Sequence, residues 1–515
     1  MSETVRNFIA GTWCDAADQR SFQSYNPADL EDVIATVPLS SRADVDRAVT
    51  AAREALPAWR RLPAPRRGEL IFRAAELLTA NKDRLGNLVS REMGKVLAEG
   101  LGDVQEAIDI GYYMAGEGRR LQGETVPSEL PDKDCKSVRF PLGVVALVTP
   151  WNFPIAIPSW KLFAALICGN TAILKPSSDT PACAAAFVEI LEQAGFPAGV
   201  VNLVCGPGGE AGEYLLTHPG VDAASFTGSC AAGEALEAKL AALHRPVALE
   251  MGGKNAIIVM EDADLELALE GVLWGAFGTT GQRCTATSRV VVHQSVYGRF
   301  LTMLAERAAA LKLGYGVDPE TQVGPLINER QFERVLKYVQ IGKEEGARLV
   351  TGGQRITDGP LATGFYLAPT VFADVRPTMR IAQEEIFGPV LSVIPCSGLD
   401  EAISIVNGSR YGLSSAIYSR NVNTTARAER DLETGIVYIN ASTIGAEVQL
   451  PFGGWRHSGS GHPEAGGRGG AIDFFSKTKV IYRDFSGKLQ KAQIDKMDEG
   501  FPPLPSLDNQ EHEHV

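Results

Sequence analysis

Residues 143–150 read GVVALVTP, a short apolar run, and the helical pattern IPSWKLFAALICG follows it at 157–169. Three more strand-like runs lie at 170–177, 200–208 and 223–229, and each precedes a stretch with helical spacing. Short apolar runs that alternate with helices are typical of βαβ units, whose parallel strands are buried on both faces. The stretch therefore predicts a parallel sheet covered by helices, of the kind that binds nucleotides.

A second α/β segment begins near residue 253. Its apolar runs have the length and the Val/Ile content of buried strands, and they read NAIIVM, SRVVVH, TVFADV, LSVIPC and GIVYIN. Upstream, residues 42–118 carry apolar side chains at three- and four-residue spacing, which predicts helices. A polar passage at 122–141 and the late run KTKVIYRDF at 477–485 are predicted to pair as a small β element.

The composition is that of a globular protein, since 45% of the 515 residues are apolar and 22% are charged. The net charge of −13 argues against nucleic acid as a partner, because phosphates attract basic surfaces. No run of about 18 uncharged apolar residues occurs, so we expect no membrane span. The N-terminus MSETVRNFIAGTWCDAADQR lacks the basic start and apolar run of a signal peptide, which predicts a cytoplasmic protein.

The eight cysteines include no CxxC pair, and the seven histidines show no HExxH spacing, so we expect neither a disulfide framework nor a metal site. One cysteine, Cys284, lies among small polar residues in GQRCTATS at 281–288. Free cysteines are usually buried as small apolar residues, so packing is the leading interpretation of Cys284 taken alone.

Two further polar residues lie where chemistry is feasible. Glu250, between Leu249 and Met251 at a strand-to-loop junction, is expected to be partly buried. Burial raises the pKa of a carboxylate and suits it to act as a general base, although a paired structural glutamate fits the pattern too. Asn152 in PWNFP is fixed by prolines and aromatic residues and could stabilise an oxyanion, or could simply bond to the local backbone.

Glycine-rich turns suggest a phosphate site. FTGSCAAG at 226–233 places Gly228 and Ser229 between a strand and a helix, where backbone N–H groups favour a phosphate; an ordinary turn is an equal alternative. The stretch GPGGEAG at 206–212 lacks GxGxxG spacing and is predicted to be a turn.

Taken together, these segments resemble the aldehyde dehydrogenase superfamily over residues 20–485. The stretches that carry the resemblance follow the family's order: PWNFP, KPS..TP (175–181), FTGS, LEMGGK, GQRCTATSR, EEIFGP (384–389), NGSRYGLS (407–414) and PFGG (451–454). The spacing of Glu250 and Cys284 (284 − 250 = 34) also fits the family. The C-terminal part looks like the bacterial 2-oxoglutarate semialdehyde dehydrogenase-like branch.

The resemblance implies the oxidation of an aldehyde to a carboxylic acid through a thiohemiacetal and a thioester on Cys284. Asn152 and the Cys284 backbone N–H would hold the oxyanion, and Glu250 would activate the hydrolytic water. Lys161 would lie on the helix that supports the site. No histidine is near Cys284 in sequence, so its activation by dipoles, by bound cofactor or by Glu250 stays open.

The resemblance also implies a nicotinamide cofactor, NAD or NADP. Lys175 would bond to the adenosine ribose, Ser229 beside Gly228 to the pyrophosphate, and Glu385 to the nicotinamide ribose. Trp151 and Phe387 would line the cleft. NAD-preferring relatives often have Glu three residues after the lysine, whereas this chain has Ser178, which predicts that NADP is usable.

The substrate prediction rests on the residue before the nucleophile. Arg283 could hold a carboxylate or phosphate at the far end of the aldehyde; a structural ion pair is at least as good an interpretation. The resemblance of the C-terminal part is what suggests a carboxylate-bearing semialdehyde such as 2-oxoglutarate semialdehyde. The chain has His462-Pro463-Glu464 where relatives commonly read HREAG, which puts a proton-relay role for Glu464 in doubt.

Four alternatives stay open at this point. They are a broad-specificity enzyme for aliphatic or aromatic aldehydes, a cofactor-independent thiol esterase, a CoA-acylating enzyme and a non-catalytic protein on the same fold. Glu250 favours hydrolysis over acylation of CoA, and the cofactor positions argue against an esterase.

The predicted fold is α/β, with a Rossmann-like cofactor domain (1–121 and 142–252) and an α/β catalytic domain (253–455). A small β oligomerisation element (122–141 and 456–490) would support a homodimer or homotetramer, because exposed strand edges need covering. Residues 491–515 are predicted to be a polar tail.

Overall fold

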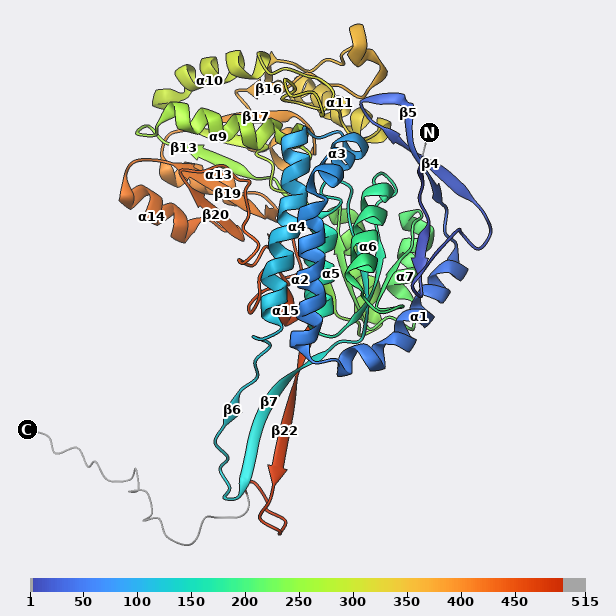
Figure 1. Ribbon diagram of the computed structural model, residues 1–515. Helices are drawn as coiled ribbons and strands as arrows, with labels where there is room; N and C mark the ends of the chain where they lie inside the picture. Colours follow the sequence, from blue (N-terminus) through green and yellow to red (C-terminus); the bar gives the residue numbers. More distant parts are fainter. Residues whose placement is uncertain (1–2, 494–515) are drawn as a thin grey trace, which may run out of the picture.

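Figure 1 shows the fold as a computed structural model, which describes residues 3–493. The first of its two large sheets has the strand order β12-β11-β8-β9-β10-β2-β3. The strands are β2 Asn7–Ile9, β3 Thr12–Cys14, β8 Val144–Val148, β9 Thr171–Lys175, β10 Val201–Leu203, β11 Ala223–Thr227 and β12 Val247–Glu250. The strands β8 to β12 are parallel, and β2 and β3 extend one edge in antiparallel orientation. The four strands predicted from the sequence are confirmed.

Alternate residues of the central strand β8 enter two separate cores. Val145 and Leu147 pack in one apolar cluster, whereas Val144, Ala146 and Val148 pack in the other. Helices therefore bury both faces of the sheet, as its continuous apolar strands require. These helices are α1 Arg42–Arg61, α2 Ala64–Ala80, α3 Lys82–Met93, α4 Leu97–Glu117, α5 Ala156–Ile167, α6 Pro181–Ala194, α7 Glu213–Thr217 and α8 Cys230–Ala242.

The second large sheet has the order β15-β16-β17-β14-β13-β19-β20, and only β15 at its edge runs antiparallel. Its strands are β13 Ala256–Val259, β14 Arg289–His293, β15 Arg348–Thr351, β16 Thr370–Ala373, β17 Val390–Cys396, β19 Ser414–Tyr418 and β20 Ile436–Ile439. The helices around it are α9 Leu265–Phe277, α10 Gln294–Ala309, α11 Glu329–Glu344, α12 Arg380–Gln383, α13 Leu399–Asn407 and α14 Val422–Asp431. The sequence predicted five of the seven strands and missed β15 and β19.

A narrow three-stranded sheet projects from the body of the molecule in Figure 1. It consists of β6 Thr125–Val126, β7 Lys133–Pro141 and β22 Ser476–Asp484, in the order β22-β7-β6. The predicted pairing of residues 122–141 with the late strand is confirmed, because β22 and β7 pair antiparallel along their whole length, from Ser476 opposite Pro141 to Asp484 opposite Lys133. We call this sheet the arm.

Some elements were not expected from the sequence. The strands β1 Glu3–Thr4, β4 Ser21–Asn26 and β5 Asp29–Pro38 form a further small sheet near the N-terminus. The segment predicted as a turn at 206–212 contains a helical turn, Gly208–Gly212. Two short strands, β18 Tyr411–Gly412 and β21 Trp455–Arg456, pair with each other, and the short helix α15 Ala471–Phe474 leads into the arm. The predicted tail lies almost wholly outside the described residues.

The carboxyl ends of the parallel strands carry several of the predicted site residues. Lys175 is the last residue of β9, Thr227 of β11 and Glu250 of β12. Ligands of open α/β sheets bind beyond these ends, which is where the site is to be sought. Within residues 3–493, no helix is long and apolar enough to cross a membrane.

Candidate active site

Cys284 follows a tight turn with an unusual backbone. Thr279, Thr280 and Gly281 all have positive φ angles, of 50°, 56° and 67°. A Cβ atom on Gly281 would lie 2.3 Å from the carbonyl oxygen of Gly388, so only glycine fits there. The turn ends α9 and directs the chain back through Cys284 toward β14.

Amide side chains hold the main chain on both sides of the thiol. Asn255 Nδ2 donates to the Cys284 carbonyl oxygen at 2.7 Å and to that of Ala286 at 2.9 Å. Asn152 Nδ2 donates to the Gln282 carbonyl oxygen at 3.1 Å, and Asn152 is only 3% exposed. An amide NH2 group has two hydrogens, so Asn152 keeps a second donor for an oxygen atom beside Cys284.

Glu250 is buried beside this loop. Its Oε2 accepts the Gly454 N–H at 3.2 Å, whereas Oε1 has no hydrogen-bond partner in the described part of the chain. Burial, with a smaller contribution from Glu464, raises the pKa of Glu250 well above its usual range. A buried, unpartnered carboxylate oxygen of this kind can accept a proton from a water molecule.

Glu464 lies in the same interior, although Pro463 had put its role in doubt. Its Oε1 accepts hydrogen bonds from both Lys161 Nζ and the Thr227 hydroxyl. Lys161 Nζ also donates to Ser225 Oγ at 2.6 Å. Polar groups thus link the first sheet to Glu464, whose charge raises the pKa of Glu250.

The pKa of the Cys284 thiol is raised. Burial is the main cause, and the negative charges of Glu250, Glu464 and Glu385 raise it further. A thiol with a raised pKa needs a base to remove its proton before the sulfur can act as a nucleophile.

Lys175 and Ser178 converge on one carbonyl oxygen. Lys175 Nζ donates to Gly206 O at 2.8 Å, and Ser178 Oγ donates to the same oxygen at 3.0 Å. Burial lowers the pKa of Lys175 to about 8. A buried ammonium bonded only to main-chain carbonyls fits a ribose, whose hydroxyls would complete its hydrogen bonds.

Ser229 and Glu385 are the other polar residues predicted to bind the cofactor. Ser229 caps α8 by accepting the Ala232 N–H at 3.4 Å, directly after Gly228. Glu385 Oε1 accepts the Gly253 N–H at 3.1 Å. A Cβ atom on Gly252 would lie 2.1 Å from the Glu385 carboxylate, so bare backbone is needed for this approach. These donors and acceptors fit a nicotinamide dinucleotide.

Trp151 and Phe387, which are predicted to line the cofactor cleft, contact each other. The rings of Trp151 and Phe387 meet edge to face, with centroids 5.4 Å apart. Phe387 has a φ of 62°, and Gln331 Nε2 donates to its carbonyl oxygen at 2.7 Å. The protein thus holds an unfavourable backbone conformation here by a specific hydrogen bond.

Arg283 is held by partners within the protein. Its Nη2 lies 2.9 Å from Glu99 Oε1, and its guanidinium lies 5.2 Å from the centroid of the Phe153 ring. A guanidinium has five N–H groups, of which the described residues use two. The substrate-binding role of Arg283 stays a prediction.

Sequence reasoning missed the acidic side of α4. Glu99, Asp103 and Glu106 follow the i, i+4, i+7 spacing of one helix face, which was the available signal. Burial, helped by Asp103, raises the pKa of Glu106 to about 7. Glu106 and Cys284 both interact electrostatically with Tyr438. Helix α4 therefore lies near the Cys284 thiol.

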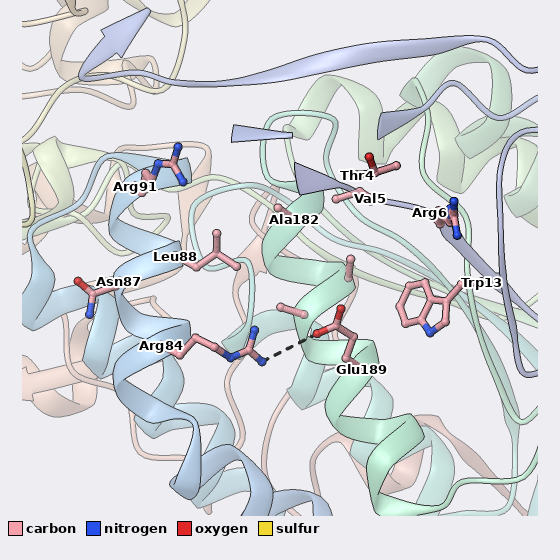
Figure 2. A pocket seen from close by; sticks show the side chains of 12 residues that line it. Thr4, Val5, Arg6, Trp13, Arg84, Asn87, Leu88, Arg91, Ala182 and Glu189 are labelled. Carbon is pink, nitrogen blue, oxygen red and sulfur yellow. Dashed lines mark ion pairs between the residues drawn. The ribbon is translucent and has the colours of Figure 1, made fainter. Parts of the chain in front are cut away.

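A hollow of about 660 Å³ lies at a different place, between the N-terminal strands and the helices α3 and α6. Figure 2 shows the side chains that line it. Arg84 faces Glu189 across it at 3.9 Å. Trp13 on its rim donates its indole N–H to Glu192 at 2.8 Å. No cysteine lines the hollow, and we assign it no part in the reaction.

A thiol held between fixed amides, beside a parallel sheet with a ribose-type donor set, defines the class of NAD(P)-dependent oxidoreductases that work through a covalent thioester. Comparison with known proteins agrees. The model of the aldehyde dehydrogenase family matches residues 13–481. The chain therefore belongs to the aldehyde dehydrogenase family, and it is an enzyme that oxidises aldehydes with NAD or NADP.

Individual relatives cover nearly the whole chain. The alpha-ketoglutaric semialdehyde dehydrogenase of Bacillus subtilis is 41% identical over 93% of this chain and 98% of its own length. The alpha-ketoglutarate semialdehyde dehydrogenase of Haloferax volcanii is 39% identical over 94% of this chain and 100% of its own length. The crystal structure of betaine aldehyde dehydrogenase from Staphylococcus aureus in complex with NAD+ superposes with a TM-score of 0.91 at 34% identity, over 95% of this chain and 97% of that one. These relatives confirm the fold class.

The effect of the Glu250 charge on the pKa of the Cys284 thiol should be measurable. Glu250→Gln removes a negative charge that raises the pKa of the thiol. The pKa of Cys284 should fall, so its alkylation by iodoacetamide at a fixed alkaline pH becomes faster and the pH profile moves to lower pH. Aldehyde oxidation should fall about 100-fold or more, because a general base is lost. Peptide mass spectrometry locates the label among the eight cysteines. An unchanged alkylation profile would show that the Glu250 charge does not reach the thiol.

Proposed function

We propose that Cys284 is the nucleophile of this aldehyde dehydrogenase and that Glu250 is its general base. The observation that carries the proposal is the unpartnered, buried Oε1 of Glu250, whose charge acts on the thiol. Glu250 takes the thiol proton, the sulfur adds to the aldehyde carbon, and the carbonyl π electrons move to the oxygen. The second N–H of Asn152 and the main-chain N–H of Cys284 hold that oxyanion.

Collapse of the thiohemiacetal re-forms the C=O bond as the C–H bond breaks. A nicotinamide dinucleotide held by Lys175, Ser229 and Glu385 would supply the acceptor for that hydride. The acyl group stays on Cys284 as a thioester. Glu250 releases the thiol proton to solvent, then takes a proton from the water that attacks the thioester and passes it to the departing thiolate. The carboxylic acid leaves, and the thiol is regenerated. The charges of Glu464 and Lys161 act on Glu250 in opposite senses, since Glu464 raises its pKa and Lys161 lowers it.

The cofactor would lie along the carboxyl edge of the first sheet. In this proposal Lys175 and Ser178 face the adenosine ribose, and Ser229 with Gly228 faces the pyrophosphate. Glu385 holds the nicotinamide ribose, and the ring lies near Trp151 and Phe387. Support comes from the open backbone at Gly252 and from the exclusively main-chain partners of Lys175.

The proposed substrate is a carboxylate-bearing semialdehyde of the 2-oxoglutarate semialdehyde type. Its support is the name of the Bacillus subtilis and Haloferax volcanii relatives, which cover almost the whole chain. A broad-specificity enzyme for neutral aldehydes is the second candidate. The specific observation in its favour is the acidic surroundings of Cys284, where Glu250, Glu464 and Glu385 all act on the thiol.

A substrate panel with both cofactors tests the function. Cys284→Ser should lower aldehyde-dependent NADH formation at least 1,000-fold while NAD still binds, because the thiol is the stronger nucleophile. For the unaltered enzyme, kcat/KM for 2-oxoglutarate semialdehyde should exceed that for hexanal at least tenfold, about 1.4 kcal/mol. Added CoA should not accelerate the reaction. Equal values for the two aldehydes would favour the broad-specificity enzyme, and full activity of Cys284→Ser would reject the mechanism.

Ser178 should decide the use of NADP. The kcat/KM with NADP should lie within about 100-fold of that with NAD, a difference of about 2.7 kcal/mol. Ser178→Glu should lower kcat/KM for NADP at least tenfold more than for NAD, because its carboxylate repels the 2′-phosphate. Ser178→Ala is the matched control, since it removes the hydroxyl without adding charge. The same loss in both variants would assign the effect to the hydroxyl.

We also propose the division into a cofactor half (1–121 and 142–252), a catalytic half (253–455) and the arm. The segment before β22 packs on the body, since Phe474 and Phe475 join the core of the first sheet. The enzyme would be a cytoplasmic homodimer or homotetramer. All eight cysteines are free thiols, as is usual in a reducing compartment.

The arm should mediate this assembly. Val480 and Tyr482 on β22 are 57% and 67% exposed, and an exposed apolar edge strand pairs readily with another chain. Val480→Lys combined with Tyr482→Lys should lower the molar mass measured by light scattering after gel filtration. Lys479→Ser, on the opposite face of the strand, is the control and should leave the mass unchanged. An unaltered mass in the double variant would place the interface elsewhere.

A further inference from the structure

The turn before Cys284 is held in a conformation that its sequence disfavours. Thr279 and Thr280 have φ angles of 50° and 56°, and Gly281 follows at 67°. The left-handed region crowds the Cβ atom of an L-residue, and a β-branched threonine is among the least suited to it. Backbone strain of this kind persists only where the surroundings over-determine it.

Glu99, in the first turn of α4, supplies the strongest restraint. Both of its carboxylate oxygens accept the Thr279 N–H at 2.9 Å. Its Oε1 also accepts Arg283 Nη2 at 2.9 Å, and Arg283 Nε donates to Thr279 Oγ1 at 2.9 Å. Glu99, Thr279 and Arg283 thus close a ring of hydrogen bonds around the turn. We call this ring the clamp.

The clamp is almost withdrawn from water. The side chains of Glu99 and Arg283 are 12% and 11% exposed. Charge-assisted hydrogen bonds are stronger than neutral ones, and the loss of one partner would leave the other charge poorly solvated. The clamp therefore acts as a unit.

Helix α4 is a rigid base for the clamp. Lys95 and Asp103 form an ion pair of 3.0 Å whose side chains are fully buried. Asp103 also accepts the N–H groups of Ile155 at 3.3 Å and Ala156 at 2.7 Å, at the start of the helix that carries Lys161. Helix α4 therefore fixes both the segment after Asn152, through Asp103, and the turn before Cys284, through Glu99.

We propose that Glu99 is a positioning residue for catalysis, and that Arg283 serves this reaction through Glu99 and not through the substrate. The proposal rests on the assignment of Cys284 as the nucleophile made above. The clamp fixes Thr279 and Arg283, and the intervening Gln282 carbonyl is the acceptor of the Asn152 amide. Relaxation of the turn would move the thiol and the oxyanion donors relative to each other, and sub-ångström misplacement is costly in catalysis.

Glu99→Gln and Arg283→Gln test the proposal, with Asp222→Asn as the matched control. Asp222 likewise accepts one guanidinium and one main-chain N–H, from Arg53 at 2.8 Å and Val144 at 2.7 Å, but at the amino end of β8. Each clamp variant should lower kcat at least tenfold, with the KM for NAD changed less than twofold. The double variant should lose no more than the worse single variant, because the clamp is one unit.

Asp222→Asn should lower the Tm as much as the clamp variants do and leave kcat within twofold. An equal loss of kcat in Asp222→Asn would show that the clamp variants lose activity only because the fold is less stable, and it would overturn the proposal. The loss in Arg283→Gln should be the same for hexanal and for 2-oxoglutarate semialdehyde. A loss confined to the semialdehyde would also overturn the proposal, because it would assign Arg283 to the substrate.

A rescue experiment isolates the backbone. Glycine adopts the left-handed region freely, so Thr279→Gly added to Glu99→Gln should restore kcat at least threefold. Failure of the rescue would show that Glu99 does not act through the conformation of the turn. If Cys284→Ser retained activity, the proposed function itself would fail; if Cys284→Ser is inactive and Glu99→Gln is not impaired, only the clamp is rejected.

Discussion

The hydrogen bonds of one buried amide, Asn255, fix the Cys284 loop relative to the second large sheet. Asn255 Nδ2 binds the carbonyl oxygens of Cys284 and Ala286, and its Oδ1 accepts the Ser414 N–H at 3.0 Å. It precedes β13, which lies between β14 and β19, so three strands and the nucleophile loop meet at a single side chain. Buried polar groups that are fully satisfied stabilise a unique arrangement, and a partly satisfied network would be costly. The position of the thiol is therefore a property of the sheet and not of a flexible loop.

Burial of charge around that thiol explains how the site works without a histidine beside Cys284. Burial raises the pKa of Cys284 and of Glu250 together, and each negative charge opposes the other. A negative charge on either group therefore makes ionisation of the other less favourable, and in the proposed reaction Glu250 acts in its carboxylate form. Lys161 forms a buried ion pair with Glu464. Without this partner, the charge of Glu464 would lie unpaired near Glu250. The raised pKa that burial causes is what would let Glu250 take up a proton during the reaction.

The sequence predicts this fold well where one physical signal dominates. Runs such as GVVALVTP are apolar on both faces, which only a doubly covered strand requires, and β8 and β9 are found where they were expected. The signal fails for β5, which is exposed at one end and buried at the other, and for β19, whose SSAIY lacks a long β-branched run. Motif resemblance located Cys284, Glu250 and Lys175. It could not locate Glu99, because its partners are 180 and 184 residues away in sequence and only the fold brings them together.

The partner of Arg283 is likewise a residue that is distant in the sequence and that only the fold brings close. From the sequence, a cation beside the nucleophile suggests a contact with a carboxylate, and the structure does provide one, but from Glu99 of the protein itself. A substrate carboxylate would have to share that guanidinium with Glu99 or bind its remaining N–H groups, and the Glu106 carboxyl group also interacts with Arg283. Recognition of a semialdehyde would then depend on neutral donors, such as main-chain N–H groups, which bind a carboxylate without first breaking an internal ion pair. Neighbouring positions in a chain share a sequence context but not a direction in space, and after a left-handed turn the side chain next to a nucleophile can belong to the scaffold.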